Sequence, residues 1–151
     1  DRYAWFLSHI LQMLPEALPF AEEAVKLDPK SGDAQITLGL IQYRLGNIPA
    51  GDSAMKEAMK NGKPQMLCNL RMGIARFYQA KKAPYARDAI SLLKEAELLL
   101  LKAEKVGSAD DYYYFKNLED IRRYLPLVAR LRSGINRREV SSKEAPGTVQ
   151  T

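Results

Sequence analysis

The stretch LGLIQYRLGN at residues 38–47 is matched 34 residues later by MGIARFYQAK at residues 72–81. Both stretches begin with an apolar residue and a glycine, continue to an aromatic residue at Tyr43 or Phe77, and reach a small residue at Gly46 or Ala80. Small residues elsewhere keep the same interval, since position 17 pairs with 51 and position 24 with 58. A fixed period of roughly 20–50 residues indicates an array of repeated units that bury their apolar faces by stacking.

The residue balance predicts that these units are helical. Of the 151 residues, 46% are hydrophobic and 27% are charged, which is typical of a globular domain with its own core. Ala, Leu, Lys and Glu are abundant, and the few β-branched residues form no alternating runs of the kind that strands show. We therefore expect an all-α fold.

A third unit follows the two that define the period. The triplet EEA at residues 22–24 returns as KEA at 56–58 and again at 94–96. The last interval is 38 residues rather than 34, from Ala58 to Ala96, so about four residues are inserted. We expect this insertion in the turn from Lys81 to Tyr85.

Turn residues divide the chain into helices. Pro15 marks the junction between the first two helices, residues 28–33 close the first unit, and residues 61–64 close the second. The segment from Tyr85 to Lys105 is predicted to be one long helix that ends at Gly107, because its apolar residues fall on one face.

A last helix is expected to begin at Asp110 and Asp111, whose charges suit a helix start. Pro126 is predicted to kink this helix or to begin a short terminal one that ends at Gly134. Residues 1–134 then form the helical repeat domain, and residues 135–151 form a polar, flexible tail. The predicted helical face consists of Tyr114, Leu118, Ile121, Leu125 and Val128.

The 34-residue period and the order Leu-Gly, aromatic, small residue, alanine resemble the tetratricopeptide repeat family. The middle unit, Gly32 to Lys63, fits best, the first unit fits only in its second helix, and the third lacks the closing proline. About 100 residues are covered. The resemblance implies a right-handed superhelix of about three antiparallel helix pairs plus a C-terminal capping helix.

The sequence offers few groups for chemistry. His9 is the one histidine and lies in an apolar stretch, and Cys68 is the one cysteine, so neither an intrachain disulfide nor a cysteine metal site can form. No glycine-rich phosphate loop occurs. We expect no catalytic residues, no cofactor and no metal.

In the tetratricopeptide family the first helix of each unit lines a concave groove that holds a partner helix or peptide. The resemblance assigns to this groove Phe6 and His9 in the first unit, Ile36, Leu40, Tyr43 and Arg44 in the second, and Leu70, Ile74, Phe77 and Tyr78 in the third. We expect a mainly apolar groove with Arg44, Arg71 and Arg76 at its rim. Such a groove favours an amphipathic helix or apolar peptide that carries some acidic residues.

The version of this groove that grips acidic chaperone C-termini is not favoured. Only Arg71, with Arg2, remains of its polar clamp, and Thr37, Phe6 and Leu67 stand where the other clamp residues belong. A different alternative is that the groove is covered within the chain by the helix of residues 110–132, whose residues 112–115 are all aromatic.

The charge of +5 supports a competing hypothesis. Up to Pro64 there are 7 Lys/Arg against 8 Asp/Glu, and beyond it there are 16 against 10. A basic surface of this kind can bind nucleic acid or an acidic membrane. We do not favour nucleic acid, because charge runs are more often solvated surface and the repeats are too few and irregular for a helical RNA reader.

The leading hypothesis is a non-catalytic protein interaction scaffold in a multi-component assembly, for example one of a bacterial envelope or secretion system. The chain opens on Asp1 and starts directly in the apolar segment from Tyr3 to Leu14, so we interpret it as a piece of a longer protein. It holds no run of ~20 apolar residues. A cytoplasmic or membrane-associated soluble domain fits, the compartment stays open, and an oligomer is compatible.

Overall fold

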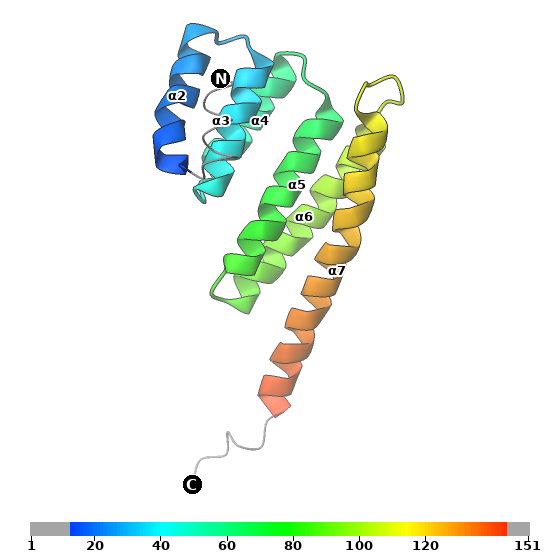
Figure 1. The fold of residues 1–151 in the computed structure, drawn as a ribbon. Helices are drawn as coiled ribbons and strands as arrows, with labels where there is room; N and C mark the ends of the chain where they lie inside the picture. The colour runs from blue at the N-terminus through cyan, green and yellow to red at the C-terminus, as the bar shows by residue number, and fades with distance from the viewer. Residues whose placement is uncertain (1–12, 145–151) are drawn as a thin grey trace.

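The computed structural model describes residues 13–144, with side-chain burial up to residue 139. Four expected features fall outside this range: the first helix of the first unit, the groove residues Phe6 and His9, the clamp residue Arg2, and the last residues of the predicted tail. The described part of the chain is all-helical and holds no strand, as predicted (Figure 1). Its helices are α2 (Leu14–Leu27), α3 (Gly32–Arg44), α4 (Ile48–Lys60), α5 (Gln65–Lys82), α6 (Ala86–Val106) and α7 (Tyr114–Glu144).

The helices pack mainly against their neighbours in sequence. Helices α3 and α4 form one hairpin, α5 and α6 form a longer one, and α7 lies along both α5 and α6 (Figure 1). The predicted start of a helix at Pro15 is confirmed, while the helix expected before it lies outside the described residues. The boundaries around residues 28–33 and 61–64 are also confirmed, and so is the long helix α6 within one residue at each end. The handedness of the expected superhelix stays a prediction.

The turns between the helices use the residues that the sequence marked as breaks. Ser31 caps α3, because its Oγ accepts a hydrogen bond from the Ala34 backbone nitrogen at 3.1 Å. Gly46 and Gly62 follow α3 and α4 with φ of 86° and 88°, the left-handed region in which only glycine is unstrained. The Asn61 side chain donates to the Pro29 carbonyl at 3.2 Å and so ties the turns of successive units together.

Two helix glycines allow close contact inside the hairpins. A Cβ added at Gly39 would lie 2.9 Å from the Met55 side chain, and one added at Gly73 would lie 3.0 Å from Leu100. These are the two glycines of the repeated Leu-Gly and Met-Gly pairs. Their shared position therefore has a packing reason, which is the approach of the second helix of each hairpin.

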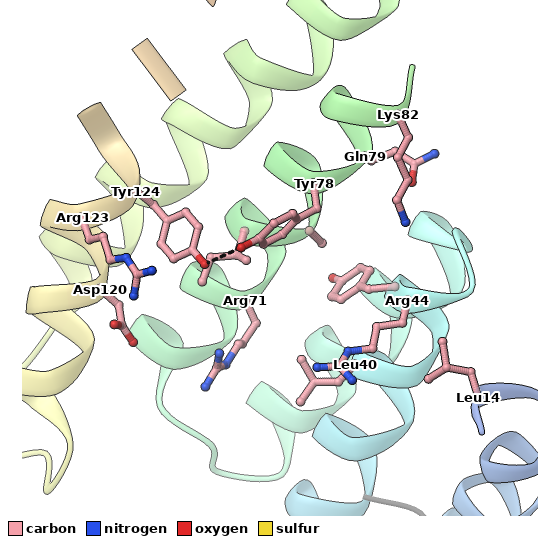
Figure 2. Close-up of a pocket in the computed structure, with 13 residues that line it drawn as sticks. Leu14, Leu40, Arg44, Arg71, Tyr78, Gln79, Lys82, Asp120, Arg123 and Tyr124 are labelled. Atoms are coloured by element: carbon pink, nitrogen blue, oxygen red, sulfur yellow. Dashed lines mark hydrogen bonds between the residues drawn. The ribbon is translucent and has the colours of Figure 1, made fainter. Parts of the chain in front are cut away.

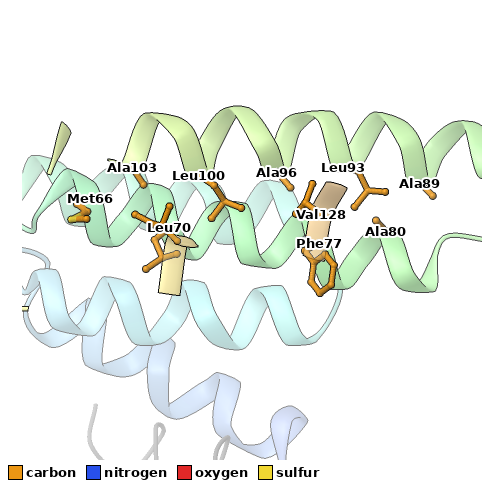
Figure 3. Packing of buried hydrophobic residues seen from close by; sticks show 11 residues of the cluster. Met66, Leu70, Phe77, Ala80, Ala89, Leu93, Ala96, Leu100, Ala103 and Val128 are labelled. Carbon is orange, nitrogen blue, oxygen red and sulfur yellow. The ribbon is translucent and has the colours of Figure 1, made fainter. Parts of the chain in front are cut away.

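The apolar interior is divided into three clusters. The largest is formed by α5, α6 and α7 and includes Leu70, Phe77, Leu93, Leu100 and Ile121 (Figure 3). A small cluster joins α2 to α3, and another joins α3 and α4 to the Cys68 face of α5. Each helix layer is thus covered by the next one.

Helix α7 differs from the prediction at both ends. It begins at Tyr114, after a turn that contains Asp110 and Asp111, and the predicted end at Gly134 is wrong because the helix continues to Glu144. The physical reason is that Ile135 still packs on the large cluster, which outweighs the roughly 1 kcal/mol cost of a helical glycine. Residues 135–144, expected in the flexible tail, are therefore helical.

Pro126 lies within the continuous helix. Proline has no backbone N–H, so the carbonyl of Arg122, four residues earlier, loses its intrahelical hydrogen bond. Both residues are exposed, and water can take the place of the missing donor. The predicted apolar face of α7 is confirmed, since all five of its residues pack in or against the large cluster. The expected insertion in the turn at 81–85 lies partly in α5, which has 18 residues where α3 has 13. Among the described helices, none is long and apolar enough to cross a bilayer.

Candidate functional site

A cavity of about 970 Å³ lies between α3 and α5, with α7 as its far wall and the start of α2 at its edge (Figure 2). Helices α3 and α5 both face the cavity because each is the first helix of its hairpin. Helix α7 lies beside them because its apolar stripe packs on the large cluster. The lining residues are Leu14, Leu40, Tyr43, Arg44, Arg71, Ile74, Ala75, Tyr78, Gln79, Lys82, Asp120, Arg123 and Tyr124.

The structure brings six of the predicted groove residues together at this cavity: Leu40, Tyr43, Arg44, Arg71, Ile74 and Tyr78. Leu70 and Phe77 do not face it, because α7 packs on that side of α5 and leaves them 0% and 5% exposed in the core. Ile36 packs against the cluster beneath α3 and α4, outside the lining.

Helix α7 supplies a tyrosine pair at the wall of the cavity. The hydroxyls of Tyr78 on α5 and Tyr124 on α7 are 3.0 Å apart and hydrogen-bonded (Figure 2). Burial, together with this bond, raises the pKa of Tyr124 to about 12. Phe77 stacks edge-on against both rings, with its centroid 5.3 Å from that of Tyr78 and 5.7 Å from that of Tyr124. The pair fixes how far α7 stands from α5.

The alternative in which the last helix covers the groove within the chain is correct in part: α7 buries Leu70 and Phe77, but the aromatic residues 112, 113 and 115 do not cover the cavity. Tyr112, Tyr113 and Phe115 are 90%, 59% and 74% exposed at the turn before α7 and at its start, away from the cavity lining. The helix instead contributes Asp120, Arg123 and Tyr124 to one wall, which the sequence reasoning missed. Positions 120 and 124 lie about 100° and 60° from the buried position 121 on the same side of the helix, next to the predicted apolar stripe. That edge of the stripe was the sequence signal that could have predicted this wall.

The cavity is more cationic than the expected apolar groove. Among the residues that the structure describes, the cations Arg44, Arg71, Lys82 and Arg123 line it together with one carboxylate, Asp120. Leu14, Leu40, Ile74 and Ala75 provide its apolar surface. An apolar side chain of a ligand can therefore pack on aliphatic and tyrosine side chains in this cavity, while a neighbouring carboxylate of the same ligand forms an ion pair with an arginine.

Arg76, expected at the groove rim, is instead part of a buried ion pair on the other side of α5. Its Nη1 donates to Asp52 Oδ1 at 2.6 Å, a second bond joins Nη2 to Oδ2, and Nε donates to Glu95 at 3.3 Å. The side chains of Arg76 and Asp52 are only 11% and 16% exposed. The guanidinium is thus held between α4 and α6 and cannot reach a ligand in the cavity.

Tyr43 connects this ion pair to the cavity. Its hydroxyl donates to Asp52 Oδ1 at 2.6 Å, and its ring packs so closely on Gly51 that an added Cβ would overlap the ring. Burial and then the bond to Asp52 raise the pKa of Tyr43. The close packing of this ring therefore requires a glycine at position 51.

The charged forms of the pair are stabilised by each other. Burial raises the pKa of Asp52, but hydrogen bonds from Arg76 and Tyr43 outweigh it, so the net pKa lies below the ordinary value. Burial lowers the pKa of Arg76, and the bond and charge of Asp52 reverse this to a net increase. The pair stays ionised at neutral pH and locks four helices, α3 to α6.

The remaining reactive groups do not form a site. Cys68 is 0% exposed and burial raises its pKa to about 11, so it is a thiol at neutral pH. Within residues 13–144, no three side chains of His, Cys, Asp or Glu are grouped to hold a metal ion. No protein-family model matches the chain, and a search of curated proteins finds no match.

Proposed function

We propose that the protein is a non-catalytic interaction module that binds a helix or peptide of a partner protein in the cavity between α3, α5 and α7. In this proposal the helix pairs are tetratricopeptide-like repeats, and the module acts within a larger assembly. The observation that carries it is the convergence of six predicted groove residues on one cavity, although they come from helices of different units.

The composition of the cavity supports a particular kind of peptide. Leu40, Ile74 and Ala75 offer apolar surface, and Arg71 on α5 and Arg123 on α7 line the same cavity (Figure 2). An apolar side chain flanked by Asp or Glu satisfies both features at once. The ligand proposed is therefore an amphipathic segment with acidic residues, the same kind of ligand that the sequence favoured.

The proposal can be tested with a variant in which a larger side chain fills the cavity. Peptides are selected from a random display library on the wild-type chain and then measured on Ala75→Trp, whose indole occupies the cavity. We expect at least about a tenfold loss of affinity, since a single well-placed interface residue contributes on the order of 1–2 kcal/mol. Amide chemical shifts on addition of a peptide should change at residues that line the cavity.

The matched control is Ala50→Trp, the same substitution at an exposed position of α4 outside the lining, which should leave affinity unchanged. If Ala75→Trp alters the circular dichroism spectrum, Arg71→Glu at the same cavity replaces it. Peptides that bind Ala75→Trp and the wild type equally would contradict the proposal.

Binding of a nucleic acid is the second candidate, and the excess of four cations over one carboxylate favours it. It makes a different prediction, because binding to phosphates releases counterions and weakens steeply with salt. Measuring affinity for an oligonucleotide between about 50 and 200 mM salt distinguishes the two, since a loss of several orders of magnitude is typical of phosphate contacts.

A further inference from the structure

Helix α7 carries a row of basic residues at seven-residue intervals: Lys116, Arg123, Arg130 and Arg137. Seven residues fall about 20° short of two helical turns, so the four side chains follow one narrow stripe along the helix. All four are exposed. We call this row the basic stripe of α7.

The position of Arg123 fixes which way the stripe faces. Arg123 lines the cavity, and its guanidinium carbon lies 5.8 Å from the ring centroid of Tyr124. The buried positions Ile121 and Val128 lie about 140–160° further around the helix and face α5 and α6. The basic stripe therefore borders the cavity and continues along α7 on the same side.

The stripe differs from the other arginines of α7 in its partners. Arg132, on the side toward α6, pairs with Glu97 at 3.4 Å, and Arg138 donates to the Gly134 carbonyl at 3.2 Å. No carboxylate of the described residues lies within ion-pair distance of any stripe residue. Within the described residues, none of the stripe cations is therefore used in an ion pair, and Arg123 alone contacts a ring, that of Tyr124.

We propose that the basic stripe binds an acidic helix of the partner, whose Asp or Glu residues also recur every seven positions, while an apolar side chain of that helix enters the cavity. This inference rests on the proposed function and specifies its ligand. The stripe cations follow one another at about 10.5 Å along the axis, which is the spacing of carboxylates at i and i+7 on a helix that runs alongside.

The same spacing argues against a nucleic acid. Phosphates follow each other at about 3.4 Å along the axis of one strand of a duplex, so cations at about 10.5 Å would neutralise roughly one phosphate in three. A helix with heptad-spaced carboxylates matches the stripe one to one. Charge pairs flanking an apolar contact are also how paired helices select register.

The experiment compares two labelled helical peptides of about 22 residues with identical composition, including four glutamates and an apolar stripe. One has its glutamates seven residues apart beside the apolar stripe, and the other has them five residues apart, which distributes them around the helix. Fluorescence anisotropy gives both affinities for the full chain. We expect about tenfold tighter binding of the first peptide, because several exposed ion pairs of roughly twofold each accumulate.

Charge reversal tests the stripe directly. Arg130→Glu combined with Arg137→Glu should remove the preference, and a peptide with lysines at the seven-residue positions should then bind the double variant better than the wild type. The matched control is Arg87→Glu combined with Arg122→Glu, which changes the net charge equally on exposed residues outside the stripe. This control should keep the preference.

Equal affinity for the two peptides overturns the inference, as does an equal loss in the two double variants. Tighter binding of a thymidine oligonucleotide than of the seven-spaced peptide also overturns it, in favour of a phosphate ligand. Failure of the proposed function is separate, because it appears as insensitivity to Ala75→Trp. Sensitivity to Ala75→Trp without any spacing preference leaves the proposed function standing and removes only the stripe from it.

Discussion

The helices α2 to α4 and the helices α5 to α7 are packed in different ways. In the first group the buried residues are mostly small, and the two clusters contain three and four of them. In the second group a single cluster contains eleven, including Leu70, Leu93, Leu100 and Ile121. Part of the interior of the first group also belongs to α5, through Cys68 and Met72. We conclude that α2 to α4 depend on stacking against a more stable C-terminal unit.

The largest expected effect is a substitution in the large cluster. Leu100→Ala removes a fully buried side chain that packs on Gly73 and should lower the free energy of unfolding by about 3–4 kcal/mol. Leu38→Ala, at a half-buried position of the small α2–α3 cluster, should cost only about 1–2 kcal/mol. Urea unfolding monitored by circular dichroism measures both. Equal losses would mean that the two halves do not differ in this way.

The next effect concerns the ion pair that joins the halves. Asp52→Asn leaves Arg76 with only the more exposed Glu95 as a charge partner and should destabilise the protein by about 2 kcal/mol. This is below the roughly 3–5 kcal/mol typical of a deeply buried pair, because Glu95 remains and both side chains of the pair retain some exposure. Unfolding should also become less cooperative, with α2 to α4 melting first. The control, Asp33→Asn, breaks an exposed pair with Lys63 and should change little.

The same pair predicts a pH dependence. The folded pKa of Asp52 is lowered, so its contribution to stability is present above the unfolded pKa of about 3.9 and is lost as the pH falls through the folded pKa. The unfolding free energy of the wild type should therefore fall more steeply below about pH 4 than that of Asp52→Asn. Parallel curves would show that Asp52 is not stabilised in its ionised form.

The smallest effects contrast two helical glycines. Gly51→Ala places a methyl group against the Tyr43 ring and should destabilise by about 1–2 kcal/mol, because ring and helix must shift. Gly134→Ala meets nothing closer than the Arg138 side chain at 3.9 Å and should stabilise α7 by about 0.5–1 kcal/mol. Thermal unfolding of the two variants should shift in opposite directions. A stabilised Gly51→Ala would remove the packing reason given for that glycine.

Much of the fold could be predicted from the sequence because its signals are local. The turns at 28–33 and 61–64 contain glycine and asparagine or proline at the positions where the chain must reverse, and the glycines at 39 and 73 recur at the period of the hairpins. The end of α7 could not be predicted from Gly134 alone. Its helical state depends on Leu131 and Ile135 finding the large cluster, which is a tertiary effect.

The site was predicted less completely because charge partners are distant in the sequence. Arg76 reads as one more surface cation, and its pairing with Asp52, 24 residues earlier, is set by the packing of α4 on α5. Leu70 and Phe77 occupy groove positions in the repeat pattern, but α7 covers them here. What the pattern could supply was the face that α3 and α5 share, and Leu40, Ile74 and Tyr78 do lie there.

The length of α7 gives the molecule a mechanical property. Among the side chains that the structure describes, which run to residue 139, Ile135 is the last on α7 that packs on the large cluster. The helix beyond it, residues 136–144, forms an arm about 13 Å long that follows an anchored part of about 32 Å (Figure 1). A load applied to the arm acts as a torque about Ile135. The anchored part is more than twice as long as the arm, so the packing forces along it oppose this torque over a longer lever. The cavity wall at Tyr124 lies well inside the anchored part. A pull at the tip of α7 therefore disturbs the wall of the cavity very little.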